Sequence, residues 1–268
     1  MNIVNAVKKM LNKGKNTKID YITFVPDGEP TLDEDIGKEI VEMKRITDIK
    51  IAVITNGSLL YREDVQEDLS EANLVSIKVD TVSSKTFKLI NRPHPKLKLE
   101  NVLAGIKEFS KGCKCEIITE TMLVSGINDS TEELVAVAKF LKQVNTSKAY
   151  IAVPTRPPAE KWVRSPSESR ILEAYQIFSN YLGEDRVQLL ISYEGEQFSS
   201  VAEDPINGFL SIIAVHPMRL DYALRFIEKS GLDSIETLDK LKREDSITLV
   251  EYKGYKFVMR KHKTTRTK

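Results

Sequence analysis

A turn at residues 27–30 carries the most specific signal for chemistry in this sequence. It contains Gly28, Glu29 and Pro30 and directly follows an apolar run rich in β-branched residues. Glycine lets the backbone approach a ligand closely, and a proline keeps the residue before it out of helical geometry. Thr31 and Glu34 have the spacing of a capping box for a following helix. Carbonyl and carboxylate oxygens in such a loop can accept hydrogen bonds from a ligand ammonium group, and a plain turn with a helix cap is the alternative.

Polar residues occupy similar positions around other apolar runs. They are Thr55 and Asn56, Asp80, Glu120, and the stretch 126–129 beyond it. The carboxyl ends of parallel strands share one edge of a sheet, and active sites of folds built from alternating strands and helices form there. We therefore expect a candidate site at this edge. Several of these residues can instead serve as helix caps, and that alternative stays open.

The elements that must position these residues follow one theme from Ile19 to Ser192, namely a short β-branched run, a turn, and a longer segment with helical spacing. That alternation is typical of strand-helix units with a parallel sheet. The predicted strands are Tyr21–Val25, Ile49–Thr55, Leu74–Asp80, Glu116–Leu123, Ala149–Val153 and Val187–Ile191. The predicted helices are Asp33–Ile46, Arg62–Ser70, Ser83–Ile90, Leu99–Phe109, Thr131–Val144 and Glu168–Leu182. Most strands are apolar on both faces, which predicts a sheet covered by helices or curled into a barrel.

An amphipathic helix, predicted over Asn2–Lys13, precedes the first clear strand. A βα barrel normally begins with a strand. The fold prediction for residues 1–195 is therefore an α/β partial (βα) TIM-like barrel that lacks its first strand.

The pattern changes after residue 192. Tyr193–Asp204 is polar and is predicted to be a linker. The remaining predicted elements are three helices, Ile206–Val215, Leu220–Ser230 and Ser234–Lys242, and two strands, Ser246–Tyr252 and Tyr255–Arg260. Three helices followed by a hairpin predict a small winged helix-turn-helix domain over residues 203–262, with a basic tail at 263–268. This shape serves protein docking as well as DNA reading.

The formal net charge of +1 conceals an uneven distribution. Residues 252–268 contain seven Lys or Arg and no acid, whereas residues 1–251 contain 33 Lys or Arg against 39 Asp or Glu. A basic tail can touch phosphate, and a solvated terminus is the simpler interpretation. The acidic body disfavours a broad phosphate-binding face.

Composition and missing motifs exclude several classes of protein. No apolar run approaches the roughly 20 residues of a membrane helix, and the first residues lack a signal-peptide pattern, so we expect a cytoplasmic protein with no membrane partner. The three histidines are scattered, which disfavours a histidine metal site, and Walker, dinucleotide and GxSxG motifs are absent. Cys113 and Cys115, the only cysteines, are separated by one residue, so we expect ordinary thiols and no disulfide framework.

Five segments together are similar to one family. They are YITFVPDGEPTL, AVITNGSLL, INRPHP, LVSGIND and PTRPPAEKWV. In them the chain resembles radical S-adenosylmethionine (radical SAM) enzymes, and specifically an uncharacterised prokaryotic subgroup that resembles wyosine-type tRNA-modifying iron-sulfur oxidoreductases. The resemblance spans nearly the entire chain. It implies a barrel of the radical SAM type, often followed by a winged helix, with S-adenosylmethionine and a 4Fe-4S cluster as cofactors.

The resemblance also implies roles for the residues at the strand ends. Gly28, Glu29 and Pro30 would contact the methionine amino group of the cofactor. Residues near the methionine or ribose portion would be Thr55, Asn56, Asp80 and Glu120, and those bordering adenine would be Val124 through Ile127. Asp27 departs from the small residue that is usual at its position.

The segment that binds the cluster in the family does not occur in this sequence. Three thiolates of a CxxxCxxC run hold three irons, and the fourth iron chelates the amino and carboxylate groups of S-adenosylmethionine. No such run is present, so the metal ligands are missing. In the family the missing strand and cluster loop both precede the first helix, so Met1 is expected to be an internal start. Binding of S-adenosylmethionine by this chain is expected to be weak or absent.

Three functions remain open. The first is a radical SAM enzyme, which cleaves S-adenosylmethionine reductively to a 5'-deoxyadenosyl radical, in a truncated version without its cluster. The second is a naturally cluster-free relative that acts as a binding or regulatory protein. The third is a nucleic-acid-binding protein in which the winged helix and basic tail dominate. An in-frame CxxxCxxC upstream of Met1 would separate the first from the second, and the substrate stays open between RNA, a peptide and a small molecule.

Overall fold

The computed structural model describes residues 2–13, 18–25, 28–191 and 204–261, and the chain divides into two compact units. Unit 1 comprises residues 1–9, 16–154 and 162–191, and unit 2 comprises residues 10–15, 155–161 and 192–268. The predicted linker, apart from Asp204, and the basic tail lie outside the described residues. None of the described helices is long and apolar enough to span a membrane.

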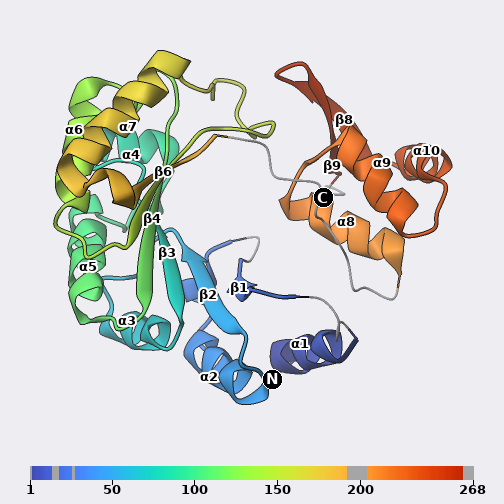
Figure 1. The fold of residues 1–268 in the computed structure, drawn as a ribbon, viewed down its shortest axis with the longest axis horizontal. Coiled ribbons are helices and arrows are strands. Elements are labelled where there is room, and N and C mark those ends of the chain that lie inside the picture. Colours follow the sequence, from blue (N-terminus) through green and yellow to red (C-terminus); the bar gives the residue numbers. More distant parts are fainter. Residues whose placement is uncertain (1, 14–17, 26–27, 192–203, 262–268) are drawn as a thin grey trace. The chain divides into compact units, whose positions relative to one another are not determined.

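Unit 1 is built on a six-stranded parallel sheet whose strands follow one another in chain order (Figure 1). The strands are β1 (Tyr21–Phe24), β2 (Lys50–Thr55), β3 (Leu74–Lys78), β4 (Glu116–Met122), β5 (Lys148–Ala152) and β6 (Val187–Leu190). Its helices are η1 (Pro30–Leu32), α2 (Ile36–Ile46), α3 (Glu63–Ser70), α4 (Ser84–Ile90), α5 (Leu99–Gly112), α6 (Thr131–Leu141), α7 (Glu168–Leu182) and η2 (Glu184–Arg186). Helix α1 (Asn2–Lys13) has its first eight residues in unit 1 and the rest in unit 2. Within the described ranges β1 does not pair with β6, so the sheet is open.

The helices that follow the strands cover one face of the sheet, and the strand residues on that face are buried (Figure 1). In β2, Ile51 and Val53 are fully buried, whereas Ile54 is 44% exposed. The pairing register places Lys78 opposite Glu120, so these two residues share the helix-free face. The α/β fold with a parallel sheet is thus as predicted, and every predicted element lies within three residues of its observed bounds.

Unit 2 packs three helices on a small antiparallel sheet. Its elements are α8 (Pro205–Val215), β7 (Met218–Arg219), α9 (Leu220–Lys229), α10 (Ser234–Arg243), β8 (Ile247–Tyr252) and β9 (Tyr255–Arg260). The sheet order is β7-β9-β8. Phe209 of α8 and Phe226 of α9 lie in its core with ring centroids 5.7 Å apart, beside the fully buried Val258.

The predicted capping box at Thr31 and Glu34 is wrong. Thr31 lies in η1, and its hydroxyl donates a hydrogen bond to Glu29 (2.7 Å) instead of capping a helix. Helix α2 begins only at Ile36, after Asp35, whose side chain makes no capping hydrogen bond. The short 3-10 turn, which begins at Pro30, delays the start of the helix beyond the reach of the Thr31 hydroxyl.

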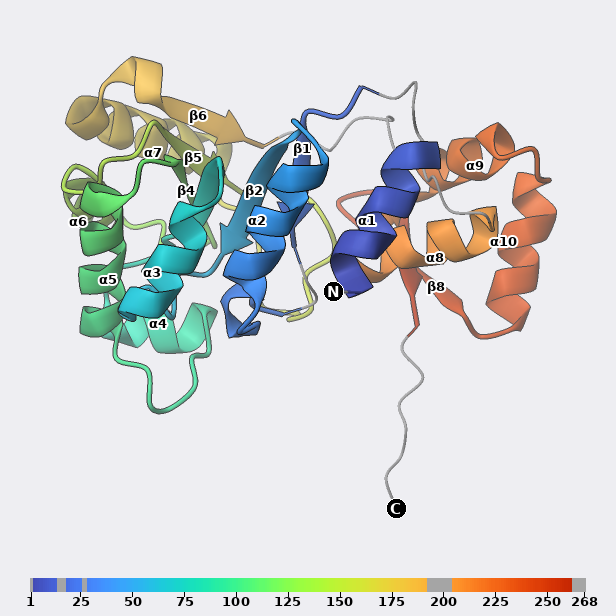
Figure 2. The same cartoon turned by 90° about the horizontal axis from the view of Figure 1, so that it is seen from below.

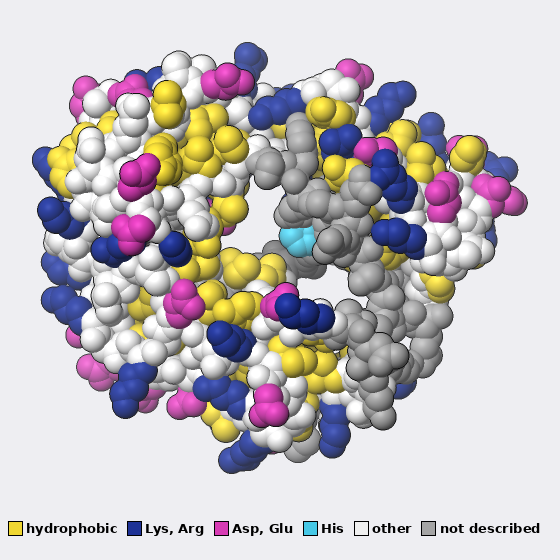
Figure 3. All heavy atoms as spheres, viewed as in Figure 1, with side chains coloured by type: hydrophobic (Ala, Val, Ile, Leu, Met, Phe, Trp, Pro, Cys, Tyr) yellow, Lys and Arg dark blue, Asp and Glu magenta, His cyan; other side chains and the backbone are white. Residues whose placement is uncertain are grey.

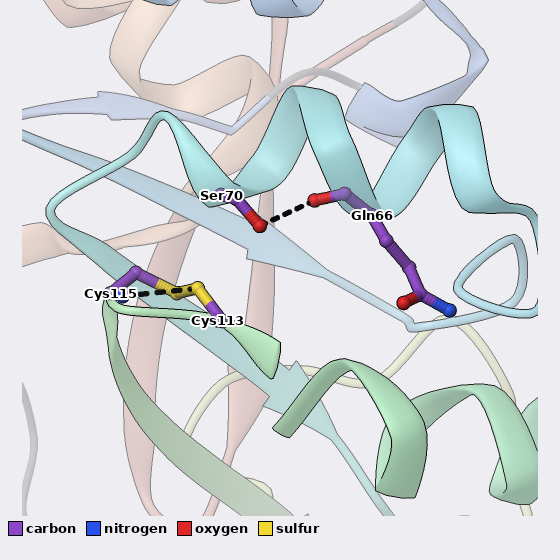
Figure 4. The surroundings of a disulfide bond; sticks show 4 residues. All are labelled: Gln66, Ser70, Cys113 and Cys115. Carbon is purple, nitrogen blue, oxygen red and sulfur yellow. Dashed lines mark hydrogen bonds between the residues drawn. A yellow bond between two sulfur atoms is a disulfide. The ribbon is translucent and has the colours of Figure 1, made fainter. Parts of the chain in front are cut away.

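The two cysteines are joined in a disulfide, so the expectation of ordinary thiols is wrong (Figure 4). Cys113 follows the end of α5 in an extended conformation, and Cys115 directly precedes β4. This geometry separates their Cα atoms by 5.3 Å, which is within the range that a disulfide spans. Figure 4 shows the bond near Ser70 at the end of α3.

Glu39 of α2 is a buried acid whose Oε2 has no hydrogen-bond partner among the described residues. Burial, together with the negative charge of Asp33, raises the pKa of Glu39. The folded protein then binds the proton of Glu39 more tightly than the unfolded chain does. The free energy of unfolding therefore falls as the pH rises from the pKa of Glu39 in the unfolded chain to its raised pKa in the folded protein.

We therefore expect Glu39→Gln to unfold at higher urea concentration than the parent at pH 7, with a difference that shrinks toward pH 4. Urea titrations at several pH values measure this. A difference that is equal at pH 4 and pH 7 would contradict the assignment of the pH dependence to Glu39.

Candidate functional site

The carboxylate of Glu29 ties the loop before η1 to the end of β2. Its Oε1 accepts hydrogen bonds from the Thr55 hydroxyl (2.5 Å) and from the backbone N–H of Thr31 (3.2 Å). Its Oε2 accepts one from the backbone N–H of Asn56 (2.8 Å). Thr55 is 2% exposed, so its hydroxyl fixes the loop from a buried position. Most of the acceptor capacity of Glu29 is thus used within the protein.

The backbone beside Glu29 is open to a ligand at Gly28. A Cβ atom added at Gly28 would meet nothing within 4 Å, and the residue is exposed. Pro30, in contrast, is buried at the start of η1. The loop therefore offers backbone groups to a ligand, while the Glu29 side chain holds the loop in place. Pro26 and Asp27 lie outside the described residues.

Asp80 is the centre of a second polar group, just beyond the end of β3. Its side chain is 2% exposed, and Oδ1 accepts a hydrogen bond from the backbone N–H of Met122 (2.9 Å). The Asn91 side chain donates to Oδ2 (3.0 Å). Asp80 therefore joins β4 and the end of α4 to the end of β3.

Lys78 lies between two carboxylates on the helix-free face. Its ammonium is 2.9 Å from Glu120 Oε1 and 3.4 Å from Asp80 Oδ1. Burial alone would lower the pKa of Lys78, but the charges of Asp80 and Glu120 outweigh burial and raise the pKa. The three groups together carry one excess negative charge when all are ionised, so they favour a ligand that donates hydrogen bonds through hydroxyl or ammonium groups.

Asn128 holds the loop after β4 against the same edge. Its side-chain amide donates to the backbone carbonyls of Asp80 (2.8 Å) and Met122 (2.9 Å), and its Oδ1 accepts from the N–H of Val124 (2.7 Å). Val124 is buried at 3% exposure, whereas Ile127 is half-buried, so apolar surface at this loop comes from Ile127. Ser130 caps α6 by accepting from the N–H of Glu133.

The structure thus gathers the predicted residues into two groups at one edge of the sheet. Glu29 holds Thr55 and Asn56 in the first, and Asp80 and Glu120 meet at Lys78 in the second. Sequence reasoning missed Lys78 and Asn91. A lysine at the end of a strand rich in apolar residues, two positions before Asp80 and hence on its face, was the available signal for Lys78. Nothing in the sequence pairs Asn91 with Asp80, because that contact depends on where α4 ends.

The two cysteines do not fit a 4Fe-4S cluster at this edge. They are bonded to each other beside the start of β4, whereas the polar groups lie at the strand ends. In the described ranges no three His, Cys, Asp or Glu side chains are arranged to hold a metal ion. These residues do not supply the three thiolates that such a cluster requires.

Comparison with known proteins identifies relatives across nearly the full chain. Residues 2–141 match the Radical SAM superfamily. The chain is 41% identical over 262 residues to the UPF0026 protein MJ1312 of Methanocaldococcus jannaschii. The aligned region covers 98% of this chain and 81% of that relative.

Two solved structures share the fold at low sequence identity. A domain of pyruvate-formate lyase-activating enzyme from Bacteroides vulgatus superposes with a TM-score of 0.50 and 20% identity, covering 64% of this chain and 98% of that one. Streptococcus suis SuiB bound to S-adenosylmethionine superposes with a TM-score of 0.54 and 15% identity, covering 72% of this chain and 43% of that one. At these identities the likeness shows the α/β fold alone.

Proposed function

The chain belongs to the Radical SAM superfamily, and from this premise we propose that the carboxyl edge of the sheet in unit 1 binds S-adenosylmethionine. The observation that carries the proposal is the arrangement of Lys78, Asp80 and Glu120, whose excess negative charge suits the hydroxyl and ammonium donors of that molecule. Gly28 adds a backbone that a ligand can approach, and the half-buried Ile127 adds apolar surface for adenine.

For these 268 residues the proposal is restricted to binding. In the superfamily the cluster supplies the electron that cleaves S-adenosylmethionine to a 5'-deoxyadenosyl radical, and the two cysteines of this chain do not fit it. The specificity of wyosine-type tRNA-modifying enzymes stays a prediction, because the comparisons identify the superfamily and no substrate.

Binding without iron chelation is expected to be weak. The strand ends offer a few hydrogen bonds, each contributing about 0.5–1.5 kcal/mol net, together with burial of adenine. Against the loss of translational and rotational freedom, that leaves a dissociation constant of about 1 mM.

Nuclear magnetic resonance of the ¹⁵N-labelled chain tests the proposal, with S-adenosylmethionine added to about 10 mM, ten times the expected dissociation constant. We expect the amide signals of Gly28, Asn56 and Met122 to shift together in a saturable way. Glu120→Gln is expected to weaken binding several-fold. Glu116→Gln is the matched control, since Glu116 is exposed at the opposite end of the same strand and shares the face of Glu120. Shifts confined to other parts of the chain, or none at 10 mM, would contradict the proposal.

A second candidate is the cluster-free binding or regulatory relative. Both of the chain's cysteines are engaged in a disulfide, so neither Cys113 nor Cys115 is a free thiolate for a metal. Such a protein must hold its ligand without iron, so a micromolar dissociation constant that Glu120→Gln abolishes would support it over the first candidate.

We also propose that unit 2 is a winged helix. Its helix-strand-helix-helix-hairpin order and its β7-β9-β8 sheet support this. The exposed side of α10 mixes Glu236 and Asp239 with Lys242 and Arg243 around Ile235, which is 69% exposed. Because these charges are mixed, contact of α10 with a protein is favoured over contact with a nucleic-acid backbone.

A further inference from the structure

One segment of unit 1 is basic throughout. Residues 81–99 contain five Lys or Arg and no Asp or Glu, within a stretch of 251 residues in which acids outnumber bases. The five are Lys85, Lys88, Arg92, Lys96 and Lys98. We call residues 85–98, which run from α4 to the residue before α5, the basic segment.

Elsewhere on unit 1 many surface cations are paired with acids. Lys38 contacts Asp35 at the start of α2, Arg62 contacts Asp64 at the start of α3, and Arg170 contacts Glu173 within α7. On the face drawn in Figure 3, Lys and Arg side chains are interspersed with Asp and Glu side chains over unit 1. A surface with mixed charges has no electrostatic potential of a single sign.

Unlike the three cations just named, the four lysines of the basic segment have no ion-pair partner among the described residues, and no Asp or Glu lies between them in the sequence. Lys85, Lys88, Lys96 and Lys98 are all exposed, and within the described part of the chain none of their ammonium groups makes an ion pair or a hydrogen bond. Four cations without carboxylate partners attract a polyanion, because binding releases the counterions that surround it.

The basic segment is ordered and is anchored at the candidate site. Asn91, in the middle of the segment, donates to Asp80 Oδ2. Pro93 and Pro95 restrict the loop, the N–H of Leu97 bonds the carbonyl of His94 (2.9 Å), and Arg92 adopts a left-handed conformation with φ of 47°. Non-glycine residues are held in such conformations where the surrounding structure enforces them, often at functional sites. Figure 2 shows the loop between α4 and α5 extending away from the body of unit 1.

We propose that the basic segment binds the sugar-phosphate backbone of a nucleic-acid strand and brings that strand to the site at Asp80. This deepens the proposed function, on which it rests, by naming the substrate class. A single phosphate cannot engage cations distributed over residues 85–98, whereas a strand with regularly spaced phosphates can. α4 has only seven residues, too few for an amphipathic helix that lies in a membrane surface.

The salt dependence of binding follows from the number of contacts. On a single strand each neutralised phosphate contributes about −0.7 to the slope of log K against log salt concentration. Four lysines therefore contribute a slope of roughly −3.

Fluorescence anisotropy of the full chain with labelled RNA and DNA of one sequence, about 20 nucleotides long, tests the proposal. The test variant carries Lys85→Gln, Lys88→Gln, Lys96→Gln and Lys98→Gln. The control variant carries Lys44→Gln, Lys111→Gln, Lys139→Gln and Lys142→Gln, which are also exposed, so both variants lose the same net charge. The basic tail is present in both, so its contribution cancels.

We expect the test variant to bind at least tenfold more weakly than the control variant at low salt, with a slope smaller by roughly 3. Weaker binding of either RNA or DNA supports the proposal, and their ratio identifies the preferred sugar. The proposal would be overturned if both variants lost the same affinity for the strand. It would also be overturned if the lysines of the basic segment were needed for binding to anionic phospholipid vesicles but not for binding to the strand. The titration with S-adenosylmethionine separates the two proposals, because the test variant should keep that binding and Glu120→Gln should keep strand binding.

Discussion

Replacing Asp80 with alanine is expected to lower the free energy of unfolding of unit 1 by about 3 kcal/mol. The Asp80 carboxylate is almost fully buried, and it accepts hydrogen bonds from Met122 and Asn91. Alanine leaves both donors without that acceptor, and each buried group left unsatisfied costs about 1–3 kcal/mol. It also removes one of the two carboxylates beside Lys78. Urea unfolding followed by the fluorescence of Trp162, the only tryptophan and a member of unit 1, measures the change.

Asp64→Ala is the control for this substitution. Asp64 is exposed and paired with Arg62 at the surface of α3, so its loss is expected to change the free energy of unfolding far less than the loss of Asp80. If Asp80→Ala were as mild as Asp64→Ala, the contacts of Asp80 would not support the strand ends as described.

Gly105→Ala is expected to destabilise unit 1 by about 2–3 kcal/mol. A Cβ atom at Gly105 would lie 2.4 Å from the carbonyl carbon of Leu60 and 2.4 Å from the nitrogen of Tyr61. These are backbone atoms of the loop between β2 and α3, so they cannot move aside as the end of a flexible side chain can. Helix α5 must shift outward, and its buried neighbours Ile106 and Phe109 lose packing in the core.

Gly112→Ala in the same helix is the matched control, because nothing lies within 4 Å of a Cβ there. Helix propensity alone favours alanine over glycine by about 1 kcal/mol inside a helix, and less at its last residue. Thermal and urea unfolding should therefore show that Gly105→Ala is clearly less stable than the parent, whereas Gly112→Ala is as stable as the parent or more stable. A stabilising Gly105→Ala would refute the close approach of α5 to the Leu60 backbone.

The strand positions were predictable because short runs rich in β-branched residues alternate with segments of helical spacing. The runs at Leu74 and Glu116 contain Val, Ile and Thr, and the observed β3 and β4 begin at those residues. Helix starts were less predictable where a short turn intervenes, as at Thr31, because capping residues serve 3-10 turns and side-chain contacts equally well.

Part of the candidate site was also predictable from strand order. Parallel strands place their carboxyl ends at one edge, so Thr55, Asp80 and Glu120 had to lie on the same side of unit 1. The hydrogen bond between Glu29 and Thr55 was not predictable, because it depends on the distance between a loop and the end of a strand that are 26 residues apart in the sequence.

By itself, the sequence determined the α/β class, the order of elements, the edge where polar groups collect and the uneven distribution of charge, because periodicity, turn chemistry and composition are local properties. Only the tertiary structure decided that Lys78 joins Asp80 to Glu120, that Asn91 anchors the basic segment, and that Cys113 is bonded to Cys115. Each of these contacts depends on the register between neighbouring strands or on where a helix ends. A shift of one residue there turns a side chain to the other face, so no local pattern specifies them.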